Sequence, residues 1–274
     1  MSESDLAEHA EPVRGAVAST GARAIVASLP RRVGRFVVDW LPILIALFAY
    51  DEIHNRLGPL LPVPHTLPQI RADEVLFGAP VLAVRLQRAF YSAAHPHVWD
   101  FAALAIYTSH FFVAPAIALA LWFRARGRYL RFMWSFVGMT TLGYATYVLY
   151  PAVPPWLASQ HGALEQTHRI VRELWEQLGR SDVAATFSGT NVLANDVAAI
   201  PSLHGAYPLM IALFFWPTSR PSIRIAMALY VGLMALTLVY MAEHYVVDIL
   251  IGWAYAIATA AVMRRVWTVG SSRL

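Results

Sequence analysis

The chain has 274 residues, of which 58% are hydrophobic and 14% charged, a balance that excludes an ordinary soluble domain of this length. All 21 basic residues are arginines, and the 17 acidic residues leave a net charge of +4. Cysteine is absent, which excludes disulfides and thiolate metal sites. The composition therefore predicts an all-α polytopic membrane protein, and we expect no nucleic acid among its partners.

The first segment, residues 1–35, is polar and carries arginines, and glycine and proline interrupt it repeatedly. It lacks the continuous apolar core and the small-residue cleavage pattern of a signal peptide. We expect a cytoplasmic arm, with anionic lipid at the cytoplasmic face as its partner.

Six stretches come close to the roughly 20 largely apolar residues that a membrane span needs. The fourth is short and is stopped by Pro217. The stretches are Phe36–Ile53, Val98–Phe123, Arg131–Tyr150, Leu203–Trp216, Ile223–Met241 and His244–Met263. We therefore expect a six-helix membrane catalytic domain over residues 36–265 and a cytoplasmic tail over residues 266–274.

Two long segments between these stretches are not spans. Residues 54–97 are rich in proline and contain an amphipathic piece, Val75–Tyr91. Residues 151–202 begin with a proline-dense turn and continue through the charged piece Leu164–Leu178. Both pieces suit solvated or interfacial helices, and six spans would place both segments on the same side.

The distribution of arginines predicts the orientation. With the amino terminus inside, 14 of the 21 arginines fall in cytoplasmic segments, concentrated in short loops, as the positive-inside rule requires. The others are Arg56, Arg71, Arg85, Arg88, Arg169, Arg172 and Arg180. We expect a bacterial plasma-membrane protein with both termini cytoplasmic.

Two histidines and a carboxylate stand where apolar stretches begin on the predicted external face. They are His204, in Pro201-Ser202-Leu203-His204, and the pair His244 and Asp248. Ionisable groups are costly in a membrane and mark polar cavities there. Asp248 lies one helical turn after His244, so it can bond one ring nitrogen and leave the other as a nucleophile. Each residue alone has a structural explanation, as an interfacial histidine or a cap, whereas the joint pattern favours an external catalytic cavity.

Pro201-Ser202-Leu203-His204 and His244-Tyr245-x-x-Asp248 resemble the second and third signature motifs of the type-2 phosphatidic acid phosphatase superfamily, which comprises six-helix membrane phosphatases and phosphotransferases. Two further segments are similar to its inositol phosphorylceramide synthase branch. They are Tyr150-Pro151-Ala152-Val153-Pro154-Pro155-Trp156 and Tyr107-x-x-His110-Phe111.

The resemblance implies a phosphohistidine mechanism. His244 would attack phosphorus, and Asp248 would hold its ring and stabilise the developing positive charge. His204 would protonate the leaving oxygen and later deprotonate the incoming alcohol or water. This chemistry implies no cofactor and no metal.

The chain departs from the superfamily pattern because it has no lysine and no arginine shortly before His244. A phosphoryl group still needs compensating charge and hydrogen-bond donors. The external arginines are the candidate cations, Arg56 first among them, with Arg71, Arg85, Arg88, Arg169 and Arg172. The candidate neutral groups for substrate binding are Ser202, Tyr147, Tyr150, His110, Asn191 and Asn195.

Two of the substrate-binding candidates have alternative structural roles. Trp156 either anchors a proline-rigidified turn at the head-group level or forms a wall over the site. His110 lies mid-span and either makes a buried hydrogen bond within the bundle or lines the catalytic cavity.

The motifs predict an enzyme that moves a phosphoryl or phospho-head group, phosphoinositol included, from a lipid-phosphate donor to a lipid or polyol acceptor. One alternative is a lipid-phosphate phosphatase acting on isoprenoid or diacylglycerol phosphates, since water then replaces the acceptor. Another alternative is a non-catalytic membrane scaffold or transporter. The presence of all three residues needed for covalent chemistry argues against this alternative.

Overall fold

The computed structural model describes residues 33–53, 56, 62–186 and 196–271. Within these ranges the chain is helical and has isolated β-bridges but no strand, which confirms the expected all-α class. The predicted arm, residues 1–35, lies outside the described residues except for its last three, and Asn191 and Asn195 lie outside them too. The chain divides into two compact units, Met1–Ile45 and Ala46–Leu274, and the second contains the motifs.

The described helices occur in the following order along the chain. After a first helix, Val33–Ile53, come α3 (Leu67–Phe77), α4 (Leu82–Phe90), α5 (Val98–Arg124), α6 (Arg126–Leu149), α7 (Pro155–Gln160), α8 (Ile170–Gln177), α9 (Ser181–Thr186), α10 (Leu203–Phe215), the 3₁₀ turn η2 (Trp216–Thr218), α11 (Pro221–Tyr240) and α12 (Val246–Ser271).

Four helices of the described chain are long and apolar enough to cross a membrane: Val33–Ile53, α5, α11 and the part of α12 that ends at Trp267. The other two predicted spans correspond to α6 and α10. Helix α6 has 24 residues, but threonine, tyrosine and glycine make it less apolar. Helix α10 has only 13 residues, so it is about 20 Å long against a hydrocarbon core of about 30 Å.

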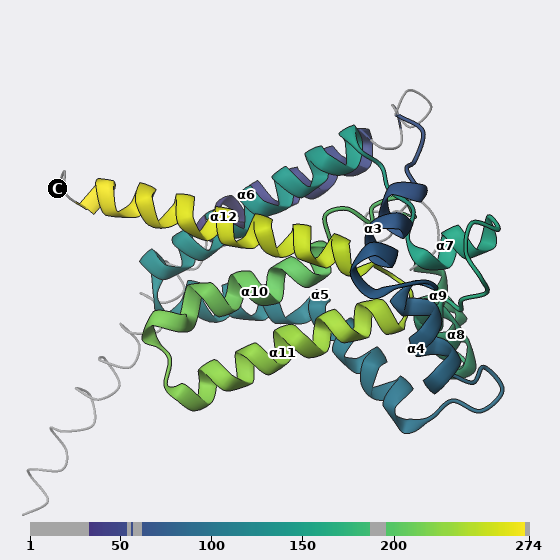
Figure 1. The fold of residues 1–274 in the computed structure, drawn as a ribbon. Coiled ribbons are helices and arrows are strands. Elements are labelled where there is room, and N and C mark those ends of the chain that lie inside the picture. The colour runs from purple at the N-terminus through teal and green to yellow at the C-terminus, as the bar shows by residue number, and fades with distance from the viewer. Residues whose placement is uncertain (1–32, 54–55, 57–61, 187–195, 272–274) are drawn as a thin grey trace, which may run out of the picture. The chain divides into compact units, whose positions relative to one another are not determined.

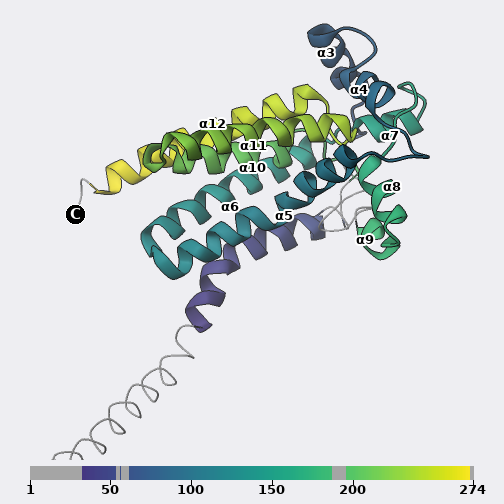
Figure 2. The same cartoon turned by 90° about the horizontal axis from the view of Figure 1, so that it is seen from below.

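Helix α10 is the packing centre of the second unit, since it contacts α5, α6, α11 and α12 (Figure 1). The short helices α3, α4, α7, α8 and α9 gather at the end of this bundle where α10 and α12 begin, as both views show (Figures 1 and 2). The start of each motif helix is therefore surrounded by the two long connecting segments.

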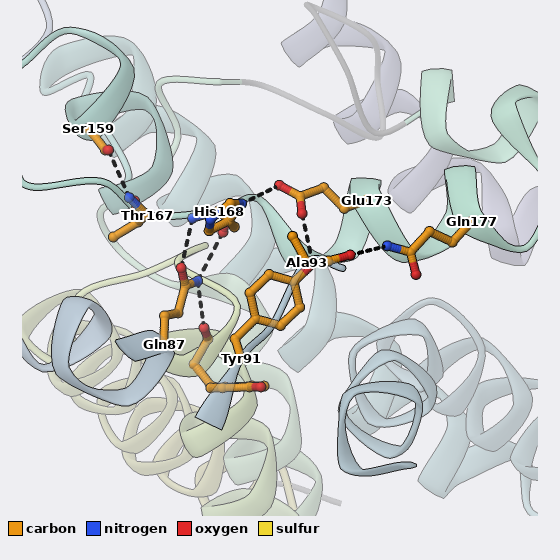
Figure 3. A network of polar contacts seen from close by, with 9 residues as sticks. Gln87, Tyr91, Ala93, Ser159, Thr167, His168, Glu173 and Gln177 are labelled. Atoms are coloured by element: carbon orange, nitrogen blue, oxygen red, sulfur yellow. Dashed lines mark hydrogen bonds and ion pairs between the residues drawn. The ribbon is translucent and has the colours of Figure 1, made fainter. Parts of the chain in front are cut away.

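A polar network ties these short helices to the bundle (Figure 3). The Gln87 side chain on α4 donates to the carbonyl oxygens of His168 at 2.9 Å and Tyr240 at 2.8 Å, and it accepts the His168 amide at 2.7 Å. Glu173 on α8 accepts from the Tyr91 hydroxyl at 2.7 Å and lies 2.9 Å from His168 Nδ1. Because Gln87 is buried, its bonds fix the end of α11 relative to the start of α8.

Candidate active site

Helix α11 ends in a Schellman motif that turns the chain toward His244. The amide of Glu243 bonds the Leu238 carbonyl at 3.0 Å, and the amide of Ala242 bonds the Val239 carbonyl at 3.0 Å. Ala242 occupies the position usually taken by glycine, with φ of 59°. A left-handed conformation at alanine costs about 1–2 kcal/mol, so the surrounding contacts must hold this turn in place. One of them is the Trp156 amide, which bonds the Ala242 carbonyl at 3.1 Å.

Two carboxylates cap the start of α12. Asp248 Oδ2 accepts the Tyr245 amide at 2.8 Å, and Asp73 Oδ1 accepts the Val246 amide at 2.9 Å. Both carboxylates are completely buried. Burial raises the pKa of Asp73, and the hydrogen bonds from Val246 and Leu82 partly offset that effect. The free amides at the helix start are thereby satisfied, and the backbone beside His244 is fixed.

The backbone at the start of α10 lies directly against the backbone at the start of α12. The Ser202 amide bonds the Asp248 carbonyl at 3.0 Å, and Ser202 Oγ caps α10 by accepting the Gly205 amide at 3.1 Å. A Cβ at Gly252 would lie 2.3 Å from the Ser202 carbonyl oxygen. The two motifs can therefore meet only because position 252 has no side chain.

The two motif histidines lie beside each other, with ring centroids 5.8 Å apart and planes inclined by 51°. His244 Nδ1 lies 3.0 Å from the Ala199 carbonyl oxygen and 3.6 Å from Asp248 Oδ2. Nδ1 thus bonds Ala199 instead of forming the expected hydrogen bond to Asp248, whose carboxylate lies at ion-pair distance. Asp248 Oδ2 accepts the Tyr245 amide, and its Oδ1 has no hydrogen-bond partner among the described residues. His244 Nε2 makes no hydrogen bond with any described residue.

His110 lies against His204, with ring centroids 4.0 Å apart and planes inclined by 31°. The Tyr107 ring lies on His204 as well, at 5.2 Å. His110 Nδ1 and His204 Nε2 are buried and have no hydrogen-bond partner among the described residues. His110 thus makes no buried hydrogen bond through Nδ1 with a described residue, and its role in lining a catalytic cavity stays a prediction.

A charged cluster adjoins His244, and we call its four residues, Arg169, Glu243, Asp196 and Trp156, the Arg169 cluster. Arg169, the N-cap residue of α8, bonds Glu243 through Nε at 3.1 Å and Asp196 through Nη1 at 3.4 Å. Its guanidinium carbon lies 4.0 Å from the centre of the Trp156 ring. Burial lowers the pKa of Arg169, but Glu243, Tyr107 and Asp196 together raise it above its usual value.

The remaining predicted substrate-binding residues take structural contacts. The Tyr147 hydroxyl donates to the Pro201 carbonyl at 2.7 Å and so supports the loop before α10. Tyr150 stacks on His65 with ring centroids 4.0 Å apart. The side chain of Arg56 is 77% exposed and pairs with Glu52, four residues earlier in the chain. The structure brings neither Tyr150 nor Arg56 into contact with the motif histidines.

Sequence reasoning missed Ala199, Asp196 and Glu243 as parts of the site. Ala199 acts through its backbone carbonyl, which no side-chain pattern reveals. Glu243 carried a usable signal, since it is a charged residue at an apolar boundary directly before His244. Arg169 was one of six arginine candidates, and its contacts with Glu243, Asp196 and Trp156 distinguish it from the others, with 11% of its side chain exposed.

Two comparisons with known proteins point to the superfamily that the sequence motifs resemble. The sequence model of the PAP2 superfamily matches residues 79–262, more than half of the chain, and both histidine motifs lie in this range. The chain is 31% identical over 242 residues to a phosphoinositol dihydroceramide synthase of Bacteroides thetaiotaomicron. The aligned region covers 84% of this chain and 77% of that protein. No solved structure matches significantly.

Proposed function

Because the chain belongs to the PAP2 superfamily, we propose that it is a membrane lipid phosphotransferase that works through a phosphorylated His244. The observation that carries this proposal is the position of His204 beside His244, with ring centroids 5.8 Å apart. At the same time, His244 Nδ1 bonds the carbonyl oxygen of Ala199. A histidine bonded through Nδ1 to a carbonyl presents Nε2 as its nucleophilic nitrogen.

The first half-reaction uses both histidines. His244 Nε2 attacks phosphorus, the bond between phosphorus and the diacylglycerol oxygen breaks, and His204 gives that oxygen a proton. In the second half-reaction His204 takes the proton of the acceptor hydroxyl, the new phosphorus–oxygen bond forms and the bond to Nε2 breaks. Asp248, 3.6 Å from the His244 ring, stabilises the positive charge that the ring carries in the intermediate.

The donor and acceptor are proposed from the relative. Its name contains phosphoinositol and dihydroceramide, and 31% identity over most of both chains supports the same pair here. The donor would be phosphatidylinositol and the acceptor a ceramide-type lipid.

The site would face the outside of the membrane in a six-span topology, with α6 and α10 as the two further spans. Both histidines lie at the end of the bundle where the short helices gather, which supports a common solvent-facing side (Figure 1).

The experiment that tests the function is incubation of the purified protein with a panel of lipid donors, with and without dihydroceramide, followed by mass spectrometry of the products. Transfer predicts a phosphoinositol ceramide that depends on both lipids and is missing with His244→Ala. Release of inorganic phosphate without an added acceptor would instead assign a phosphatase, and no product from any donor would overturn the proposal.

A further inference from the structure

The Arg169 cluster adjoins His244, although the phosphoryl-transfer steps do not use it. Glu243 directly precedes His244 in the chain, and its side chain is buried. Tyr107, whose ring lies on His204, is close enough to Arg169 and Glu243 for electrostatic interaction with both. We therefore expect a group attached to phosphorus at His244 to come close to this cluster.

Several polar groups of the cluster have no partner among the described residues. Arg169 uses Nε and Nη1 in its two hydrogen bonds, so the N–H groups of Nη2 remain available. Glu243 and Asp196 each use one carboxylate oxygen. The indole Nε1 of Trp156, a residue only 5% exposed, is buried without a hydrogen bond. Buried polar atoms without partners are rare, so a ligand that supplies the partners is indicated.

Charge decides which ligand fits. Arg169 is one cation against two carboxylates, which leaves the cluster with a net charge of −1. A phosphate monoester dianion is repelled by such a site, whereas a neutral polyhydroxyl group is not. Hydroxyl groups donate to carboxylates and accept from guanidinium and indole N–H groups, so they satisfy donors and acceptors that lie side by side.

We propose that the Arg169 cluster binds the hydroxyl groups of a polyol head group on the donor lipid and so selects phosphopolyol lipids over phosphatidic acid. This inference rests on the proposed phosphotransfer at His244. The two donors release the same diacylglycerol, so any preference between them arises at the head group. Glu243 and Asp196 accept from the polyol, while Arg169 is held between them and donates to it.

The test compares phosphatidylinositol and phosphatidic acid with identical acyl chains, using the purified full chain in detergent micelles. Diacylglycerol release gives kcat/KM for each donor, a quantity that in a two-step covalent mechanism reports only the first half-reaction. The variants are Glu243→Gln, Asp196→Asn and Trp156→Phe, each of which keeps the shape of its side chain or its aromatic face. Glu176→Gln is the matched control, because Glu176 pairs with Arg172 at 2.8 Å on the exposed side of α8.

We expect wild-type protein to prefer phosphatidylinositol, and we expect Glu243→Gln and Asp196→Asn to lower the ratio of the two kcat/KM values by roughly 10- to 100-fold each. Trp156→Phe should lower it less, and Glu176→Gln should leave it unchanged. Equal losses on both donors would assign the cluster a structural role and overturn the inference, as would a wild-type preference for phosphatidic acid. Failure of the wild type on every donor would overturn the proposed function itself.

Discussion

At the scale of single residues, the orientation of His244 depends on a backbone carbonyl as much as on the motif carboxylate. Nδ1 is 3.0 Å from the Ala199 oxygen and 3.6 Å from Asp248 Oδ2. The carbonyl fixes the tautomer, while the buried carboxylate supplies negative charge opposite the ring. This division of roles makes the consequences of changing each residue distinguishable.

Replacing His244 with alanine should abolish turnover and prevent any acid-labile phosphoenzyme, because no nitrogen remains to bond phosphorus. His204→Ala should still form the phosphoenzyme from a nitrophenyl phosphate ester, whose leaving group needs no proton, but turnover should fall by about 10²- to 10⁴-fold. Acid-quenched gels with a radiolabelled donor measure the intermediate. Exchange of these two phenotypes would invert the assigned roles, and full activity in either variant would make that histidine structural.

Asp248→Asn should lower kcat by about 10²-fold, at the lower end of the loss seen when a triad-orienting carboxylate is removed. The amide oxygen can still accept the Tyr245 amide, and Ala199 still holds the ring, so only the charge is lost. The measurement is steady-state kcat together with the thermal unfolding midpoint. A loss of activity that followed a loss of folded protein would contradict an electrostatic role.

At the scale of the helices, the site depends on how α10 and α12 begin. The loop before α10 carries Ala199 and Ser202, and its backbone bonds α12 directly. Gln87 and Trp156, from the two long connecting segments, hold the end of α11 through its carbonyls. The described parts of the connecting segments therefore position the turn that carries His244.

Gly252→Ala should separate the two motifs, because the new methyl group would meet the Ser202 carbonyl oxygen at 2.3 Å, and backbone cannot move aside as a flexible side chain can. We expect a destabilisation of about 1–3 kcal/mol, the range for overpacking, together with loss of most activity. Gly232→Ala on α11 is the control, since a Cβ there meets nothing within 4 Å. Thermal unfolding and donor cleavage measure both, and a fully active Gly252→Ala protein would refute the close-approach argument.

At the scale of the whole molecule, the described arginines at the junction of α5 and α6, between α10 and α11 and near the end of α12 stand at the opposite ends of these helices from the motif histidines. Arg128, in the first turn of α6, lies over Phe215 with its guanidinium carbon 5.2 Å from the ring centre. Arg264, near the end of α12, bonds the Leu213 carbonyl at 3.5 Å. By the positive-inside rule, this placement supports the proposed orientation, in which this end of the bundle faces the cytoplasm.

A cysteine at Gln160, at the end of α7, should react from outside sealed cells with an impermeant thiol reagent, and a cysteine at Gly127 should be protected. Both positions are exposed, and the natural chain has no cysteine, so each variant carries a single thiol. Labelling before and after permeabilisation is the measurement. The reverse pattern would place both histidines on the cytoplasmic side and overturn the proposed topology.

The sequence by itself determined the all-α class, the membrane location and the family, because composition and local spacing encode them. An apolar run of about 20 residues has few alternatives to a membrane helix, and His244 and Asp248 are one turn apart in any helix. The sequence could not establish that α10 spans, because its 13 residues are too few for a length argument.

Only the tertiary structure decided which groups surround His244. Ala199 is 45 residues away in the chain and acts through its backbone, while Arg169 meets Glu243 across 74 residues. Such contacts depend on where a close approach is sterically allowed, as at Gly252, and on which polar groups become buried together. Neither condition is a property of local sequence, so one buried arginine could be distinguished from its exposed neighbours only after the helices were packed.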